Sequence, residues 1–354
     1  MAYYSKVLNY FPTPNFLKFS YVGVDISANV IRYAELYNHG FGMHLGKWGE
    51  KKFEATEDIF TNPHLRQALK DLRKKEGIEF VKSTLPEEET YLFTVDVEDD
   101  SPEHMRENIE FHIEENVPIK ASDALFEFYI LPQNISGKKQ AVVSVVSKVL
   151  VLKYTELFES CGITPISFMI ESSSISRTAV LRDDLDTHLL VNLQDKKTVC
   201  SVISQGYVQF STTINTGSSM ITDVLKKYYS IGDEEAEKLK SEKGLTKEDT
   251  NQETFALLMN AISVLKDEIE KVSVYWQTHR DKSMKGPIKK IILAGKDAGI
   301  AGFSDYLSAT LKIEVALLDV WLNIPVFKVQ IPPIKYIDSL SFGPCIGLSV
   351  GDLV

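Results

Sequence analysis

Cysteine is scarce in this chain, with three among 354 residues. Cys161, Cys200 and Cys345 lie far apart and are odd in number, so neither a disulfide framework nor the close spacing of a metal site is expected. The seven histidines are scattered too and show no metal spacing. These absences favour a protein of a reducing compartment.

Long apolar runs and an excess of positive charge are also missing. Pro12 and Pro14 interrupt the N-terminal segment, and no later window approaches the run of about 18 apolar residues that a membrane helix needs. We therefore expect neither a signal peptide nor a membrane span. The net charge of −10 argues against nucleic acid as the main partner, because a phosphate-binding surface needs a basic patch.

What the chain does have is the composition of a globular protein of about two domains, 44% hydrophobic and 25% charged. The stretch YVGVDISANVIRYAEL, residues 21–36, predicts a strand, a tight turn and a second strand. Asp25 ends the first strand beside a polar turn, where backbone N–H groups can face a phosphate and the carboxylate its metal. On these residues alone an ordinary hairpin is the favoured interpretation.

A small α+β block is expected in the first half of the chain. Ser101 and Pro102 begin an acidic helix over 103–116. Strands over 125–131 and 140–147, a helix over 148–160 and a strand over 165–170 follow it. The block, residues 99–168, predicts a subdomain inserted into a larger unit.

Two parts of the chain share one plan. The meander over 21–48 carries Asp25 at its first turn, and the meander over 189–214 has Asn192 in the equivalent place. A helix follows each meander. This repetition predicts two related lobes around a cleft.

Several motifs together resemble the PilM family, actin-like proteins of the type IV pilus assembly platform that are related to the division protein FtsA. The resemblance runs from about residue 20 to 350, and its motifs are VGVDISANVIRYAEL, INTGSSMITDVLKKYYSI, VLKDEIEKVSVYW, IILAGKDAGIAGFSDYLSATLKIEV and FGPCIGLSVG. It implies an α/β fold of the actin-like ATPase type, with two lobes around a cleft and an inserted α+β subdomain. The implied division is a first lobe over 1–98, the subdomain over 99–168, a return to the first lobe over 169–188, and a second lobe over 189–354 with a helical subdomain at about 230–285.

The family binds ATP with magnesium in the cleft, so the resemblance also implies a set of nucleotide-binding candidates. Asp25 would be the magnesium ligand among them. The full set is Asp25, Ser27, Asn29, Arg32, Asn192, Gly217, Ser218, Glu237, Lys240, Glu268, Gly295 and Lys296.

Three loops depart from the family's glycine pattern. Ser27 and Gln194 replace the glycines of the two phosphate hairpins, and Lys296 follows the one glycine left in the adenosine loop. Close backbone approach to a phosphate or a base needs glycine. We therefore expect weak or absent binding of ATP and magnesium, slow or absent hydrolysis and no catalytic residue. In the alternative, Lys296 itself meets a phosphate and the site is re-tuned.

By resemblance, the partner is the N-terminal cytoplasmic peptide of a PilN-like membrane protein, bound in a groove between the first lobe and the inserted subdomain. The strands EFYIL and AVVSVV can supply an apolar groove or a free edge there. The protein would be a cytoplasmic scaffold at the inner membrane, in contact with the pilus motor and platform proteins and reaching the membrane only through partners. The alternatives are an ATP-binding actin-like ATPase or switch, a filament, or the cytoplasmic part of a type II secretion platform. The absence of a closing amphipathic helix or membrane span favours the pilus scaffold.

Overall fold

The computed structural model describes residues 20–27, 29–39, 42–97, 101–132, 139–245, 252–279, 286–324, 327 and 331–350. Most of the N-terminal segment interpreted above lies outside these ranges. Within them, no helix combines the length and apolar character that crossing a bilayer requires.

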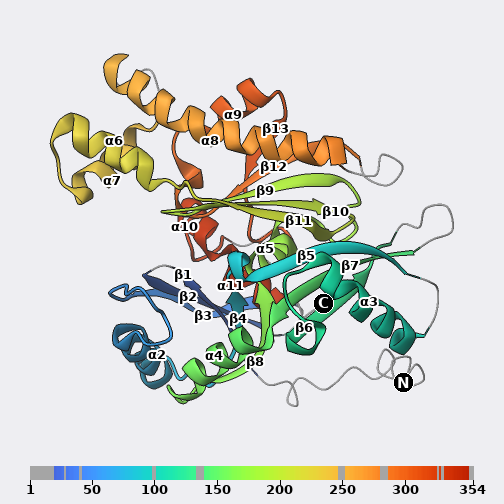
Figure 1. The fold of residues 1–354 in the computed structure, drawn as a ribbon. Coiled ribbons are helices and arrows are strands. Elements are labelled where there is room, and N and C mark those ends of the chain that lie inside the picture. The colour runs from blue at the N-terminus through green and yellow to red at the C-terminus, as the bar shows by residue number, and fades with distance from the viewer. Residues whose placement is uncertain are drawn as a thin grey trace.

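The first lobe is built on a five-stranded sheet in the order β3-β2-β1-β4-β8. Its strands are β1 (Val22–Ser27), β2 (Val30–His39), β3 (Gly42–Lys52), β4 (Phe80–Leu85) and β8 (Thr164–Ile170). The first three form the predicted antiparallel meander, while β4 runs parallel to β1 and β8 parallel to β4. The helices α2 (Pro63–Lys75) and α4 (Lys148–Glu159) lie against this sheet (Figure 1), and most of their leucines are buried in its core.

The second lobe repeats the same plan with the order β11-β10-β9-β12-β13. Its strands are β9 (Thr187–Leu193), β10 (Thr198–Ser204), β11 (Tyr207–Ile214), β12 (Ile288–Ala294) and β13 (Glu314–Leu317). Again a meander is followed by two parallel strands. The repetition seen in the sequence is therefore a repetition of topology. Figure 1 shows the helices of this lobe above its sheet: α6 (Ser219–Tyr229), α7 (Asp233–Lys243), α8 (Gln252–His279) and α9 (Phe303–Leu311).

A third sheet belongs to the inserted subdomain and has the order β5-β7-β6. It consists of β5 (Thr90–Val97), β6 (Ala124–Ile130) and β7 (Lys139–Ser147), and α3 (Pro102–Asn116) packs Ile109 and Ile113 against it. The strands do not follow the expected limits of 99 and 168. β5, before residue 99, joins this sheet, and β8, which begins before residue 168 and runs past it, belongs to the first sheet because it pairs with β4. The helix α4 likewise packs in the core of the first lobe.

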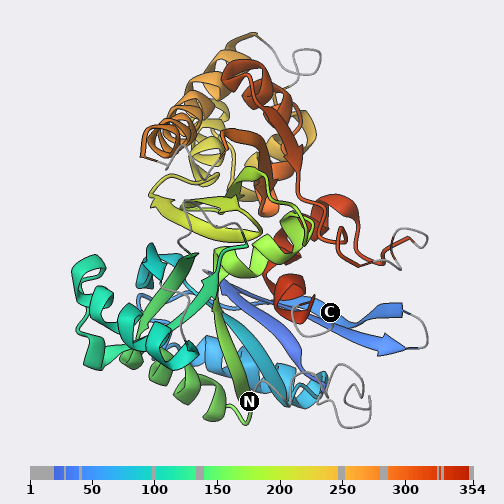
Figure 2. The same cartoon turned by 90° about the vertical axis from the view of Figure 1, so that its right-hand side faces the viewer.

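Two short helices lie between the large sheets, α5 (Glu171–Ala179) and α11 (Gly343–Val350), the latter after the single-turn α10 (Tyr336–Ser339) (Figures 1 and 2). The helix α11 comes from the end of the chain, yet it packs against β1, β2 and β4 of the first lobe as well as against α5. A Cβ at Gly347 would lie 1.8 Å from the carbonyl oxygen of Ser174. The two helices therefore cross at a distance that only glycine permits.

The sequence interpretation did not predict α5. Its sequence ESSSISRTA is rich in serine, which has a modest helix propensity. Most of its side chains are nevertheless buried, including Ser172, Ser174 and Ser176. Tertiary packing between the lobes stabilises this helix, and that packing has no local signal in the sequence.

Candidate functional site

Asp25 lies at the end of β1, where its carboxylate is 3% exposed. The hydroxyl of Thr84 on the neighbouring strand β4 donates to its Oδ1 at 2.7 Å. The hydroxyl of Ser27 donates to its Oδ2. Hydroxyl groups of the chain itself thus bond both carboxylate oxygens.

The other two candidates of the first hairpin point elsewhere. Asn29 is in the turn, where its carbonyl oxygen accepts from the N–H of Phe53 at 2.9 Å. Arg32 lies opposite Asp25 in the β1–β2 register, but its Nε is 3.6 Å from Glu50 of β3. The positive charge of this hairpin is therefore directed to a carboxylate of its own sheet.

Glu171 connects the two lobes. It is the first residue of α5, directly after β8, and its side chain is buried. Its Oε1 accepts from Asn192 Nδ2 at 2.8 Å and from Gln194 Nε2 at 2.7 Å, at the end of β9. The two amides that stand at the second phosphate hairpin therefore bond a carboxylate from the other side of the cleft.

The electrostatics around Glu171 favour its protonated form. Burial, and then the nearby charge of Asp25, raise the pKa of Glu171 to about 8, although Lys197 and the Gln194 amide act in the opposite direction. Burial also raises the pKa of Glu87, which accepts from the backbone N–H of Ser172 at 3.1 Å and from its hydroxyl at 2.8 Å. This part of the cleft is thus rich in acidic groups, a poor environment for a phosphate without a cation.

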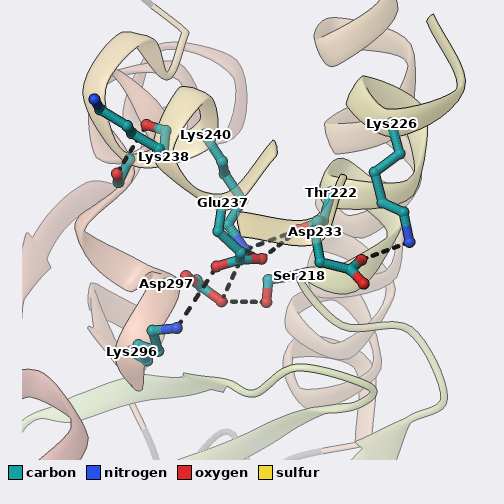
Figure 3. Close-up of polar contacts among 10 residues, drawn as sticks. Ser218, Thr222, Lys226, Asp233, Glu237, Lys238, Lys240, Lys296 and Asp297 are labelled. Carbon is teal, nitrogen blue, oxygen red and sulfur yellow. Dashed lines mark hydrogen bonds and ion pairs between the residues drawn. The ribbon is translucent and has the colours of Figure 1, made fainter. Parts of the chain in front are cut away.

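A second polar cluster surrounds Lys240 of α7, whose side chain is 2% exposed (Figure 3). Its Nζ donates to Glu237 Oε1 at 2.7 Å and to the hydroxyl oxygen of Thr222 on α6 at 3.0 Å. It also lies 3.3 Å from Asp297 Oδ2, in the loop after β12. A buried ammonium group that has three oxygen partners is fully satisfied.

Two further residues complete this cluster. Lys296 Nζ is 3.5 Å from Glu237 Oε2, and the Ser218 hydroxyl donates to Asp297 (Figure 3). Burial acts to raise the pKa of Glu237, but hydrogen bonds from Lys240 and Thr222 outweigh it and hold that pKa below its ordinary value. The cluster is therefore a set of charged side chains that neutralise one another across α6, α7 and the loop after β12.

The glycines of the cleft loops are in contact with neighbouring backbone. Gly295 has a φ of +94°, and a Cβ there would lie 2.2 Å from the carbonyl oxygen of Leu193. A Cβ at Gly217 would lie 2.4 Å from the carbonyl oxygen of Asp195. These glycines allow the loops to pack against the end of β9.

The N–H groups at the start of α6 are also occupied. Ser218 N–H donates to the Gln194 carbonyl at 2.9 Å, and Ser219 N–H donates to the Asp195 carbonyl at 2.8 Å. These are N–H groups that a helix beginning can offer to an anion. Here they bind the turn of the second hairpin.

The structure brings four candidates, Ser218, Glu237, Lys240 and Lys296, into one cluster. Asn192 is bonded to Glu171 at the start of α5. Glu268 lies on α8 and pairs with Lys271 at 2.6 Å, with no recorded polar contact to the Lys240 cluster. The candidate set remains a prediction as a nucleotide site.

Sequence interpretation missed four residues that these networks use, Thr84, Glu171, Thr222 and Asp297. Asp297 directly follows Lys296 in the chain, but its contacts are with Lys240 and Ser218, which lie far from it in the sequence. Glu171 had no local signal, because its helix was not predicted. Within the described part of the chain, no three His, Cys, Asp or Glu side chains form a group that could hold a metal ion, so Asp25 as a magnesium ligand stays a prediction too.

A separate cavity of about 440 Å³ lies between the inserted subdomain, the first lobe and α5. Leu125 and Tyr129 of β6 line it, with Phe168 and Met169 of β8, and most of the remaining lining is apolar. The strands β6 and β8 are each the last strand of their sheet. The turn between β10 and β11 closes the cavity from the second lobe, where Tyr207 stacks on Tyr129 at 5.3 Å between ring centroids.

Comparison with solved structures supports the actin-like class that the repeated lobes define. The structure titled "PilM-PilN type IV pilus biogenesis complex" aligns at a TM-score of 0.72 with 13% identity, over 94% of this chain and 98% of that one. The ethanolamine utilization protein EutJ from Carboxydothermus hydrogenoformans aligns at 0.52 with 15% identity, over 96% and 91%. MreB5 of Spiroplasma citri bound to ADP aligns at 0.51 with 14% identity, over 88% and 94%. At these identities the likeness shows the fold: two actin-like lobes, as predicted.

The sequence itself identifies the family. Residues 23–349 match the family described as type IV pilus assembly protein PilM. The chain therefore belongs to the PilM family, a family of type IV pilus assembly. No curated protein sequence matches it at a significant level.

Proposed function

We propose that this protein is a scaffold of the type IV pilus assembly platform that holds an extended segment of a partner in the cavity between β6 and β8. The observation that carries the proposal is that two sheets end at one apolar cavity. A strand at a sheet edge has unpaired backbone groups, and an extended peptide can add to it while neighbouring pockets select its side chains. The family and the PilM–PilN complex make a PilN-like cytoplasmic peptide the partner to test.

The lining fits such a segment. Leu125, Glu127 and Tyr129 alternate along β6 with residues of the subdomain core, so they share the face that meets the cavity. Leu125 and Tyr129 remain 41% and 40% exposed. Apolar side chains of a partner would cover this surface, which is the usual source of affinity in such grooves.

By this proposal the protein acts on the cytoplasmic side of the inner membrane and is attached there through its partner. Contacts with the pilus motor and the other platform proteins belong to the same proposal.

The test compares two variants that each place a glutamate on an exposed apolar position. Leu125→Glu adds a charge to the cavity, whereas Val149→Glu adds one to α4, at a 59% exposed residue outside the lining. Calorimetric titration with the first 15 or so residues of the PilN-family protein from the same genome should show binding to the wild type and to Val149→Glu. Leu125→Glu should bind at least tenfold more weakly, because a buried unpaired carboxylate is costly. Equal binding by both variants would place the peptide elsewhere.

We also propose that ATP and magnesium bind weakly or not at all, so that the protein is not an ATPase. The support is that the Lys240 cluster satisfies its own charges, that Asp25 is bonded by Thr84 and Ser27, and that Gly295 is packed against Leu193. These contacts support the proposal, because the polar groups of the candidate site already have partners within the chain. Titration with Mg-ATP should give no heat at a protein concentration of tens of micromolar, and micromolar affinity would instead favour the ATP-switch alternative.

A further inference from the structure

The cavity contains one arginine, Arg177 of α5, in a largely apolar wall. It is half-buried, and its positive charge acts on the hydroxyl of Tyr129, which lines the same cavity. Among the residues that the structure describes, no Asp or Glu oxygen lies within the 4.0 Å that would make an ion pair with its guanidinium. A guanidinium has five N–H donors, so most of them lack a protein acceptor here.

We propose that Arg177, together with Tyr129, is the polar anchor of this cavity, and that it receives an oxygen acceptor on a side chain of the bound segment. The inference rests on the proposed function, because it concerns the same cavity. A half-buried cation beside apolar side chains gains most from a planar oxygen acceptor that it can bond with two N–H groups. Both a carboxylate and a side-chain amide have that acceptor.

The position of the Tyr129 ring allows its hydroxyl to bind the same acceptor as Arg177. Its ring stacks on Tyr207 of the β10–β11 turn, at an interplanar angle of 27°. Burial raises the pKa of the Tyr129 hydroxyl, and Glu127 adds to this while Arg177 opposes it. The hydroxyl therefore remains protonated at neutral pH and can donate a hydrogen bond to the acceptor that Arg177 binds.

The two anchor residues come from different parts of the fold, which fixes where the acceptor enters. Arg177 projects from the helix between the lobes, and Tyr129 from the edge strand of the subdomain. The carbonyl oxygens of Arg177 and Val180 both accept from the Asn323 side chain, at 2.8 Å and 2.7 Å, so the backbone at the end of α5 is fixed. We expect an extended segment with apolar side chains on both sides of one Asp, Glu, Asn or Gln.

The experiment measures fluorescence anisotropy of the same labelled PilN-family peptide with full-length protein. Arg177→Gln should weaken binding at least tenfold, Arg177→Lys less, and Tyr129→Phe about threefold. Arg182→Gln is the matched control, since this arginine is exposed and lies outside the cavity lining. Circular dichroism and thermal melting of each variant establish that it is folded.

A double-mutant cycle then identifies the acceptor. Each Asp, Glu, Asn or Gln of the peptide is changed to alanine and tested against wild type and Arg177→Gln. One position should lose most of its effect in the Arg177→Gln background, and a steep salt dependence at that position indicates a carboxylate whereas a weak one indicates an amide. Additive effects at every position would overturn the anchor proposal while leaving peptide binding intact. Failure of the wild type to bind would instead overturn the proposed function.

Discussion

Removing the charge of Lys240 is the perturbation whose effect the structure defines best. Lys240→Met keeps a long side chain in a site that is 2% exposed, so packing changes little while the ammonium is lost. The carboxylates of Glu237 and Asp297 would then lose a partner at 2.7 Å and 3.3 Å. The variant therefore measures the ion cluster itself.

Loss of one partner from a buried ion pair costs about 3–5 kcal/mol. Glu237 is 35% exposed and keeps Lys296 at 3.5 Å, so solvent screening reduces its share. Asp297 is 12% exposed and keeps its hydrogen bond from Ser218. We therefore expect the low end of that range, a loss of about 3 kcal/mol in the free energy of unfolding of the second lobe.

Tryptophan fluorescence can follow the second lobe alone. The chain has three tryptophans, and Trp276 and Trp321 are both buried in the core of that lobe. In a Trp48→Phe background, urea unfolding should show a midpoint lower by about 1 M for Lys240→Met, at an m value of about 3 kcal/mol/M. Lys238→Met on the same helix is the control, since Lys238 is 71% exposed, and it should change stability by less than about 0.5 kcal/mol.

A loss of less than about 1 kcal/mol in the free energy of unfolding for Lys240→Met would refute this reasoning, because the ammonium group would then contribute little to the stability of the cluster. Adding Asp297→Asn provides a second check. It removes the carboxylate that the first substitution leaves unpaired, so part of the stability should return. If the two losses simply add, the residues do not act as a unit.

Three more predictions concern the region between the lobes and the helix α2. The raised pKa of Glu171, about 8 in the fold against an ordinary 4.5, means that the folded state holds an extra proton. The stabilising effect of this proton is present below the unfolded pKa and is lost as pH rises through about 8. The free energy of unfolding in urea should therefore fall between pH 4.5 and about 8 in the wild type, by at most about 1.4 kcal/mol per pH unit, and Glu171→Gln should remove this part of the slope. An unchanged slope would contradict this. Gly347→Ala should lower the free energy of unfolding by about 3 kcal/mol or more, and the melting temperature with it, because its Cβ would clash with Ser174. Gly286→Ala, where a Cβ meets no atom within 4 Å, should be nearly neutral. Asn62→Ala should cost about 1–2 kcal/mol in chemical unfolding, because it removes the cap that accepts two N–H bonds at the start of α2, and an effect below 0.3 kcal/mol would exclude that role.

Local signals predicted much of the fold. Ser101 and Pro102 predicted the start of α3, since a cap and a proline at the first turn act within a few residues. The strands of both meanders also lie within a few residues of the ranges predicted for them. The repeated plan then suggested two lobes, and the topology has them.

The side-chain contacts of the candidate residues could not be predicted from neighbouring sequence. Lys240 was a candidate only by resemblance, and its burial results from the packing of α6 against α7. Glu171 meets Asn192 only because two strands of different lobes end at the same place. The predicted limits of the subdomain differ from its sheet for the same reason. β8 belongs to the first lobe because it pairs with β4, and this pairing joins residues about 80 positions apart.

One helix connects the two sites of this protein. Glu171, at the start of α5, bonds Asn192 of the second lobe, and Arg177 lines the cavity between β6 and β8 six residues later, about 9 Å along the helix axis. Because most of α5 is buried and Gly347 of α11 crosses it closely, neither end can move without disturbing the other. A second contact between the lobes is the ion pair of Lys197 with Glu88. The actin-like frame thus presents a cavity of defined shape, as the proposed scaffold function requires.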